Sequence, residues 1–338
     1  MDGKNKMLMK IILTLFLVFI INNSTDVVID RLQPGVIIAN NFYRPNLSSI
    51  NYHKVKNFYQ GDNVKIAILD TGAFLQHPDF QDNNVETYNI ADKNYDITDS
   101  CKHGTSVFSI VDQIAPNANY LIIKYFPQKN CSSTLARMAD GILFAVEKEV
   151  DIILITSGSY ADNQTVQDAI NVAYEHNILV IASVGNKNSD ALFYPAAYNH
   201  VLGIGGVDVN QRYGFSNYGS YVDLMAPATM IPASYYDPAT KNYGYIYFSG
   251  TSASAPHVAG VAALLLDAKQ DLTVDELVEV LESSAFDLGE YGRDDYFGYG
   301  KVDAFSAMMY LYLSHDNVDK KKLFTTILQW IPYGRYNQ

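Results

Sequence analysis

The stretch Val64–Leu69, V-K-I-A-I-L, runs into Asp70-Thr71-Gly72 and sets the pattern of the fold. Its apolar and β-branched residues predict a strand that ends in a carboxylate followed by a turn. From this strand onward, short apolar runs alternate with amphipathic helical runs. The alternation predicts an α/β fold with a mostly parallel, twisted sheet covered by helices on both faces, in three layers. In such sheets, functional residues collect at the carboxyl ends of the strands.

Further runs of the same kind continue the alternation. Strands are expected at Leu121–Phe126, Ile152–Ile155, Leu179–Ala182 and Val201–Gly205. Helices are expected at Ser106–Asp112, Ser133–Lys148, Thr165–His176, Ala253–Asp267 and Thr273–Ser283. The run from Ala253 is apolar on nearly all sides, which predicts a buried helix. Thr273 with Glu276 three residues later predicts a capping box.

The composition is that of a globular protein, with 338 residues, 48% of them hydrophobic and 18% charged. This length suits one large domain or two ordinary ones. The 24 basic and 36 acidic residues give a net charge of −12. Because no basic stripe is available to neutralise phosphates, a nucleic acid partner is excluded. Two cysteines are too few for a disulfide framework or a four-cysteine zinc site.

The N-terminus has the features of a targeting segment. Three lysines precede the apolar run Ile11–Ile21, and polar residues follow it. Residues 1–23 therefore predict a secretory signal and an exported protein. A short membrane anchor is the alternative, although a spanning helix needs about 20 apolar residues.

Four side chains that could take part in catalysis follow predicted strands or precede predicted helices. Asp70 ends the first strand, and His103 stands in the run C-K-H-G-T from Cys101. Asn186 follows a later strand, and Ser252 lies in F-S-G-T-S-A-S-A-P-H-V-A-G before the buried helix. Singly, these are common turn and helix-cap residues. Together they supply an orienting acid, a base, a nucleophile and an amide donor, the parts of acyl transfer through an activated serine.

These segments resemble those of the subtilisin-like serine proteases, the subtilases. The order Asp, His, Ser along the chain is that family's order, and the intervals between His103, Asn186 and Ser252 are also of its kind. The resemblance runs from about Ile50 to Met309. It includes three further motifs, His77-Pro78-Asp79, Tyr194-Pro195-Ala196 and Gly298-Tyr299-Gly300-Lys301-Val302-Asp303-Ala304.

The resemblance implies a serine endopeptidase. Ser252 would be the nucleophile, and His103 would accept its proton and pass it to the leaving amine. Asp70 would orient the imidazole. The side-chain amide of Asn186 and the N–H of Ser252 would form the oxyanion hole. A peptide or protein substrate is the partner that this resemblance implies, and we expect a monomer.

The family likeness also predicts where the substrate binds. The run Asp151–Gly158 resembles the strand that pairs with the substrate backbone. The segments Thr156-Ser157-Gly158 and Ser183-Val184-Gly185 would form the two walls of the S1 pocket. Phe193 falls where many subtilisins have a small residue at the base of that pocket. We therefore expect a shallow pocket that prefers small P1 side chains.

No metal or cofactor is expected at the family's calcium loop, and a calcium site elsewhere stays an open alternative. The stretch Val111–Pro116 is much shorter than the calcium-binding loop that typical subtilisins carry there. Asp79, which matches a calcium ligand of the family, therefore lacks its partner loop. A zinc site built from His77, Asp79, Cys101 and His103 has no tetrahedral ligand spacing.

The two cysteines flank the expected cleft. Cys101 lies two residues before His103, and Cys131 follows the strand Leu121–Phe126. In an exported protein, two cysteines most simply form one bridge. We expect a disulfide between them at the rim of the cleft.

Two other functions fit part of the sequence. The run A-I-L-D-T-G-A around Asp70 matches an aspartic protease signature, but such enzymes need two carboxylates that share a site. The chain has one D-T-G and no D-S-G. A catalytically inactive subtilase-like binding module is the other alternative, and such modules typically lack a member of the triad.

The resemblance divides the chain into four parts. They are a signal peptide or short anchor at 1–23, a short pre-catalytic segment at 24–49, a catalytic domain at 50–309 and a C-terminal extension at 310–338. Secreted subtilases usually carry a sizeable prodomain, for which the segment before Ile50 is too short. A broadly degradative enzyme without it would endanger its own cell. We therefore expect a narrow-specificity processing protease, such as the leader peptidases that mature secreted peptides.

Overall fold

The computed structural model describes residues 29–33, 36–39, 44–128 and 131–315. The expected signal or anchor at 1–23 lies outside these residues, as does the expected extension from residue 316 onward. None of the helices in the described part combines the length and the hydropathy that crossing a bilayer requires. The chain divides into two units, residues 1–43 and 44–338. In the first, β1 (Ile29–Gln33) and β2 (Val36–Ala39) form an antiparallel hairpin.

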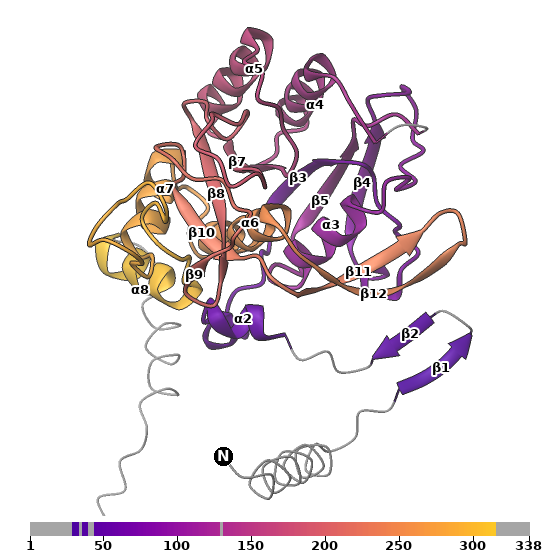
Figure 1. The fold of residues 1–338 in the computed structure, drawn as a ribbon, viewed down its shortest axis with the longest axis horizontal. Coiled ribbons are helices and arrows are strands. Elements are labelled where there is room, and N and C mark those ends of the chain that lie inside the picture. The colour runs from indigo at the N-terminus through magenta and orange to yellow at the C-terminus, as the bar shows by residue number, and fades with distance from the viewer. Residues whose placement is uncertain (1–28, 34–35, 40–43, 129–130, 316–338) are drawn as a thin grey trace, which may run out of the picture. The chain divides into compact units, whose positions relative to one another are not determined.

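An eight-stranded sheet forms the centre of the second unit (Figure 1). Seven strands run parallel in the spatial order β10-β8-β7-β6-β3-β5-β4, and the short β9 pairs antiparallel with β8. The strands are β3 (Lys65–Asp70), β4 (Asn84–Asn89), β5 (Asn119–Lys124), β6 (Ile152–Ile155), β7 (Leu179–Ser183), β8 (Val201–Asp208), β9 (Gln211–Arg212) and β10 (Leu224–Pro227). Because β3 lies between β5 and β6, its last residue, Asp70, is placed centrally at the carboxyl edge.

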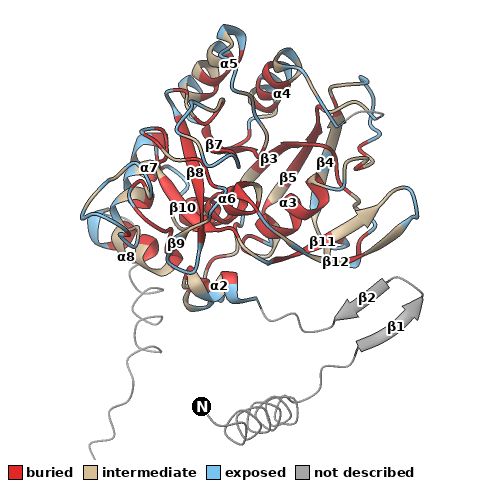
Figure 2. Cartoon of the chain, viewed as in Figure 1, coloured by how far each residue is buried: buried red, intermediate tan, exposed pale blue. Residues whose placement is uncertain are grey.

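Helices cover both faces of this sheet, so the predicted three-layer α/β fold is confirmed (Figures 1 and 2). One face packs against α3 (Gly104–Asp112), α6 (Thr251–Ala268), α7 (Val274–Ser283) and α8 (Ala304–Ser314), and the other against α4 (Leu135–Glu147) and α5 (Gln164–Glu175). The side chains of β3 alternate between the two layers, with Ile66 and Ile68 in the first core and Ala67 and Leu69 in the second. The short helices are α2 (Pro45–Ser49), η1 (Tyr52–Lys54) and η2 (Pro78–Phe80).

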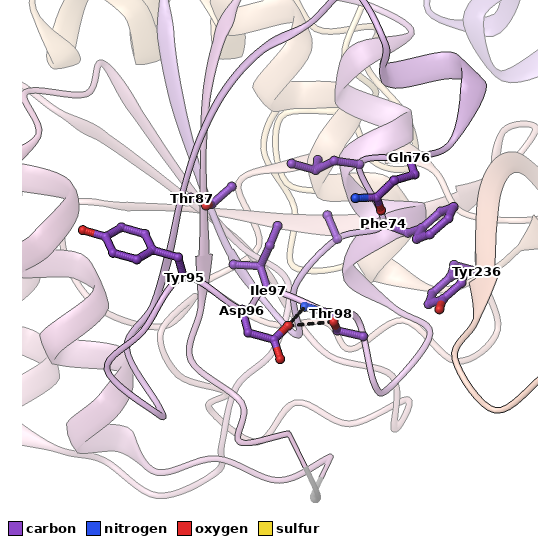
Figure 3. Close-up of a pocket in the computed structure, with 10 residues that line it drawn as sticks. Phe74, Gln76, Thr87, Tyr95, Asp96, Ile97, Thr98 and Tyr236 are labelled. Atoms are coloured by element: carbon purple, nitrogen blue, oxygen red, sulfur yellow. Dashed lines mark hydrogen bonds between the residues drawn. The ribbon is translucent and has the colours of Figure 1, made fainter. Parts of the chain in front are cut away.

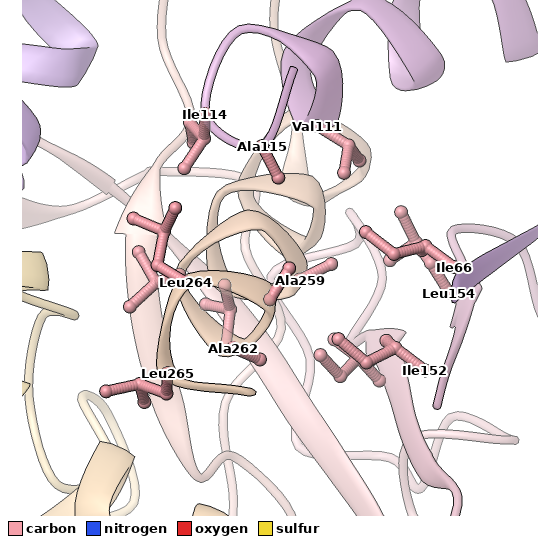
Figure 4. Close-up of a cluster of buried hydrophobic side chains, with 14 of the residues drawn as sticks. Ile66, Val111, Ile114, Ala115, Ile152, Leu154, Ala259, Ala262, Leu264 and Leu265 are labelled. Carbon is pink, nitrogen blue, oxygen red and sulfur yellow. The ribbon is translucent and has the colours of Figure 1, made fainter. Parts of the chain in front are cut away.

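The buried helix predicted from its apolar composition is α6. Its alanines at 259 and 262 lie among Ile66 of β3, Ile152 and Leu154 of β6, and Ala115 after α3 (Figure 4). At Gly260 a Cβ would approach Ile114 to 2.7 Å, so glycine permits the close approach of α6 to the end of α3. Small residues thus let α6 lie deep in its layer, which holds its N-terminus at the carboxyl edge of the sheet.

The structure also contains elements that the sequence pattern did not reveal. The edge strand β4 has the polar sequence N-V-E-T-Y-N. A separate antiparallel hairpin, β11 (Ile231–Asp237) and β12 (Asn242–Phe248), packs on α3, where Ser106 Oγ donates to the carbonyl of Ser234 at 2.9 Å. The expected capping box of α7 is present.

The compact body extends beyond the boundaries 50 and 309 expected from the sequence. At its start, Asn46 of α2 is buried and its Nδ2 lies 2.9 Å from Nε2 of His257 in α6. At its end, α8 continues to Ser314, with Leu311 and Tyr312 buried in the first core. A polar contact with α6 at the start and burial in the first core at the end, rather than the strand–helix alternation, include these residues in the domain.

Candidate active site

Asp70 and His103 form a hydrogen-bonded pair at the carboxyl edge of the sheet. Asp70, 1% exposed, accepts a hydrogen bond on Oδ1 from Nδ1 of His103 at 2.8 Å. The N–H of Thr71 donates to the same oxygen at 2.7 Å, and the hydroxyl of Thr156 donates to Oδ2 at 2.6 Å. The His103 side chain, 29% exposed, stands immediately before α3 and reaches the surface. Three donors therefore hold the carboxylate that orients the ring.

Each partner of this pair favours the charged form of the other. Burial opposes ionisation of Asp70, but the charge and hydrogen bond of His103 and the bonds from Thr156 and Thr71 outweigh it and lower the pKa of Asp70. Burial likewise opposes the charged form of His103, yet the charge and hydrogen bond of Asp70, with the charge of Asp99, raise the pKa of His103. A histidine with a raised pKa is a stronger base toward a nearby hydroxyl.

Ser252 lies in the first turn of α6, after Gly250, whose φ of +127° turns the chain into the helix. Its Oγ donates to the carbonyl oxygen of Thr156 at 3.0 Å, and no hydrogen bond within the described part of the chain joins it to His103. Thr156 thus bonds Ser252 through its carbonyl and Asp70 through its hydroxyl. Rotation about χ1 of serine redirects Oγ, and catalytic hydrogen bonds commonly tighten only when substrate binds.

Asn186, exposed in the loop after β7, is bound to the same turn of α6. Its Oδ1 accepts a hydrogen bond from the N–H of Thr251 at 2.9 Å. A Cβ at Gly250 would lie 3.4 Å from this oxygen and 3.5 Å from Nδ2, so the amide rests against the backbone that leads to Ser252. With Oδ1 engaged, the NH₂ group is the donor that this side chain offers beside the helix N-terminus.

The ring of Phe193 fills the space between two glycines of neighbouring segments. A Cβ at Gly158, after β6, would lie 2.7 Å from Cε1 of Phe193. A Cβ at Gly185, after β7, would lie 3.1 Å from Cδ1 of the same ring. Tyr160 packs edge-on against the ring, with 5.0 Å between centroids. The gap between the two segments is therefore occupied by an aromatic side chain of the protein itself.

Comparison with known proteins assigns this chain to a family. Residues 61–300 match the model of the subtilase family, peptidase S8. The chain belongs to the subtilase family. It is 35% identical to the thermophilic serine proteinase of Bacillus sp. (strain AK1) over 257 residues, 73% of this chain and 62% of that one. It thus spans less than two thirds of that relative.

In two further comparisons, the match covers most of this chain and most of the compared protein. The chain is 31% identical to thermitase of Thermoactinomyces vulgaris over 262 residues, 74% of this chain and 90% of thermitase. The crystal structure of a lanthipeptide protease superposes with a TM-score of 0.69 and 25% identity, covering 80% of this chain and 96% of that one. The residues matched by the family model, 61–300, include all four candidate residues.

The remaining residues expected to line the S1 pocket of this subtilase have different surroundings. Val184 is fully buried in the second core, and Ser183, at the end of β7, is 2% exposed. Ser157 borders a neighbouring cavity of about 420 Å³, with Tyr125, Phe126 and Cys131. Of the expected lining residues, Gly158 and Gly185 both lie against the ring of Phe193, whereas the hydroxyl of Thr156 is bound to Asp70.

The expected bridge between Cys101 and Cys131 is present, with 5.5 Å between their Cα atoms. It joins the loop before His103 to the segment after β5. Because Cys131 and Gly158 border the same cavity, the disulfide connects the loop before His103 to the lining of that cavity.

A second cavity, of about 330 Å³, lies beside the loop that follows Asp70 (Figure 3). Phe74 and Tyr236 of β11 stack on one side of it, with 3.9 Å between ring centroids. Tyr95 and Asp96 lie on another side, where Asp96 Oδ1 accepts hydrogen bonds from the N–H and the hydroxyl of Thr98. This cavity was not expected from the sequence, because its lining residues come from four separate stretches of the chain.

Sequence reasoning also missed two buried charged residues near the Asp70–His103 pair. Asp99 accepts hydrogen bonds from the hydroxyl of Thr71, the N–H of His103, and both the N–H and hydroxyl of Thr105. Lys124, at the end of β5, donates to the carbonyl of Thr71 at 2.6 Å, and burial lowers the pKa of Lys124. They hold the turn after β3 against the histidine loop. An acidic residue shortly before the histidine is the signal that points to Asp99.

Asp79, which matches a calcium ligand of subtilisins, instead binds the β11–β12 hairpin. Its Oδ1 accepts from the hydroxyl of Tyr245 at 2.7 Å and its Oδ2 from Ser234 Oγ at 2.6 Å. Both carboxylate oxygens are therefore used by protein donors. Within the described residues, no three His, Cys, Asp or Glu side chains are grouped to hold a metal ion.

Proposed function

We propose that this subtilase is a secreted serine endopeptidase whose triad is Asp70, His103 and Ser252. One observation carries the proposal, the 2.8 Å hydrogen bond from His103 to a buried carboxylate beside α6, whose first turn carries Ser252. Thr156 supports the same assignment, because it bonds both the acid and the serine. The substrate is a peptide or a protein.

In the proposed reaction, Oγ of Ser252 attacks the scissile carbonyl carbon while Nε2 of His103 takes the hydroxyl proton. Asp70 stays ionised, holds Nδ1–H of the ring and stabilises the imidazolium. The imidazolium then protonates the leaving amine as the C–N bond breaks. Water attacks the resulting acyl-enzyme by the reverse route, with His103 again as the base, and releases the carboxylic acid product.

The oxyanion of the tetrahedral intermediate is proposed to lie between the NH₂ of Asn186 and the N–H of Ser252. Two observations support this position. Asn186 is bound to Thr251 at the start of α6, and the N-terminus of α6 carries a positive dipole end with unpaired N–H groups. Donors aimed at developing charge, and already in place, need no reorganisation during the reaction.

We propose that the enzyme is a processing protease of narrow specificity with a preference for small P1 residues. The substrate backbone pairs with the segment after β6, where Ser157 and Gly158 lie. Phe193 occupies the space between Gly158 and Gly185, which leaves little room for a large P1 side chain. The solved relative titled a lanthipeptide protease supports a role in maturing a peptide.

Export is part of the proposal. The basic and apolar pattern of residues 1–23 supports a signal. The Cys101–Cys131 disulfide supports an oxidising compartment, where such bonds persist. A relative named the minor extracellular protease Epr of Bacillus subtilis (strain 168) is 33% identical over 292 residues.

Labelling with a fluorophosphonate probe tests the mechanism. The wild-type chain should be labelled at Ser252 and lose its peptidase activity, and Ser252→Ala should be neither labelled nor active. Inhibition by a transition-state peptide for aspartic proteases, without labelling, would favour an aspartic protease that uses Asp70 as one of its two carboxylates. Absence of both labelling and hydrolysis in a folded sample would favour a binding module.

A further inference from the structure

We propose that Asn217 is the positioning residue of the oxyanion hole, because its buried amide sets the course of the loop that carries Asn186. This inference rests on the proposed function. Asn217 lies between β9 and β10 and is fully buried. It lies far along the chain from Val184, Lys187 and Ser189, which it contacts.

The side chain of Asn217 contacts the Asn186 loop on both sides of Asn186. Its Nδ2 donates to the carbonyl of Val184 at 2.8 Å, before Asn186. Its Oδ1 accepts from the N–H of Lys187 at 2.9 Å and from the N–H of Ser189 at 3.3 Å, after Asn186. The loop is therefore tied at three points to one planar group.

Two further hydrogen bonds complete the arrangement. The second hydrogen of Nδ2 is directed to the hydroxyl of Tyr160 at 3.2 Å, and the backbone N–H of Asn217 donates to the carbonyl of Gly185 at 3.0 Å. An amide side chain offers two donor hydrogens and two acceptor lone pairs, and all four are used here. A carboxylate would lack the two donors, and an apolar side chain would leave buried N–H and C=O groups without partners.

This network matters because Asn186 itself is exposed and its side chain has a single hydrogen bond, to Thr251, in the described part of the chain. The place of its NH₂ is therefore set mainly by the path of the backbone from Val184 to Ser189. Stabilisation of an oxyanion depends on the distance and direction of the donor. A small shift of this backbone moves the donor, while the Asp70–His103 pair stays in place.

The contact also explains why residue 185 is glycine. Gly185 has a φ of +96°, and a Cβ there would lie 2.7 Å from Nδ2 of Asn217. The amide can reach the carbonyl of Val184 only because this side chain is absent. The same glycine faces Phe193, so the proposed S1 pocket and the proposed oxyanion hole share one backbone segment.

A double-mutant cycle with Asn186 tests the proposal. Hydrolysis of a peptide anilide with alanine at P1 would be measured for the full chain and for Asn217→Ala, Asn186→Ala and the double variant. Asn217→Ala should lower kcat by about 10- to 100-fold and change KM by less than about threefold. In the Asn186→Ala background, the same substitution should lower kcat by less than about threefold, because the donor that it positions is already gone.

Asn177→Ala is the matched control. Its amide also joins two segments, since Nδ2 donates to the carbonyl of Leu272 and Oδ1 accepts from the N–H of Val274. This variant should lower the melting temperature and leave kcat unchanged. Should Asn217→Ala fail to fold, Asn217→Ser is measured in its place, since its hydroxyl keeps one of the bonds and should give a smaller loss of kcat.

The possible outcomes distinguish the positioning role of Asn217 from the proposed serine protease function. Equal losses of kcat from Asn217→Ala with and without Asn186 would overturn the positioning role and leave the serine protease intact. A loss confined to KM would overturn it as well. If the Ser252→Ala variant kept the activity of the wild type, the proposed function would instead be overturned.

Discussion

Replacing Phe193 by glycine should shift the specificity of this subtilase from the proposed preference for small P1 side chains to acceptance of aromatic ones. The ring now contacts both walls of the proposed pocket, because a Cβ at Gly158 or at Gly185 would lie 2.7 Å or 3.1 Å from its carbon atoms. The space between the walls is thus about one ring wide. Phe193→Gly leaves an empty slot of that shape at the base of the pocket.

The size of the expected change follows from burial of the substrate side chain. Moving a phenylalanine or leucine side chain from water into an apolar slot contributes about 1.5–3 kcal/mol. If this energy is realised in the transition state, it raises kcat/KM for the phenylalanine substrate by about 10- to 150-fold. The alanine substrate, which does not reach the slot, should change by less than about threefold.

The assay compares two peptide anilides that differ only in alanine or phenylalanine at P1. The ratio of their kcat/KM values is independent of the fraction of active enzyme, which cancels any loss of stability from the missing contact with Tyr160. Leu192→Gly is the control, because Leu192 is adjacent in sequence but 49% exposed, and it should leave the ratio unchanged. A wild type that already prefers phenylalanine, or an unchanged ratio in Phe193→Gly, would refute the reasoning.

Three other substitutions test the charges and the bridge. Asp70→Asn should lower kcat by about 10⁴-fold. It should also move the acid limb of the pH–rate profile from above 6.5 to lower pH, because the charge that raises the pKa of His103 is lost. An acid limb at the same pH as in the wild type would contradict this. Burial raises the pKa of Asp112 from 3.8 to about 7, so the wild type should lose up to about 4 kcal/mol of stability as the pH rises from 4 to 8. The melting temperature of Asp112→Asn should therefore exceed that of wild type increasingly over this range, and a constant difference would count against it. Cys131→Ser opens a bridge with a sequence separation of 30, so denaturant unfolding should show a loss of about 3–4 kcal/mol, and an equal stability would refute a structural role.

The fold class was predictable because its signals are local. The strands β3, β6 and β7 are short apolar runs, and α6 is apolar on nearly all sides. The composition of these elements therefore predicts that they are buried. The polar edge strand β4 and the aromatic hairpin β11–β12 lack such a signal. The strand β4 forms because it pairs with β5, and β11 and β12 form because they pair with each other. A short stretch of sequence does not show such pairing.

The candidate site was predictable to the extent that it follows motifs. Asp70, His103, Asn186 and Ser252 each stand in a short run that includes the glycine or helix start beside it. The structure adds Asp99 and Lys124, whose partners lie in other segments. It also places the Thr156 side chain against Asp70, where the sequence suggested a pocket wall.

The sequence by itself determined the α/β class, the family and the four residues proposed for catalysis, because strand and helix periods and catalytic motifs are written in consecutive residues. Only the tertiary structure decided that Phe193 lies between two glycines and that the amide of Asn217 holds the Asn186 loop. These contacts exist because β6 and β7 pair side by side and bring distant loops to one edge. Such geometry depends on strand order and packing, which local sequence patterns do not encode.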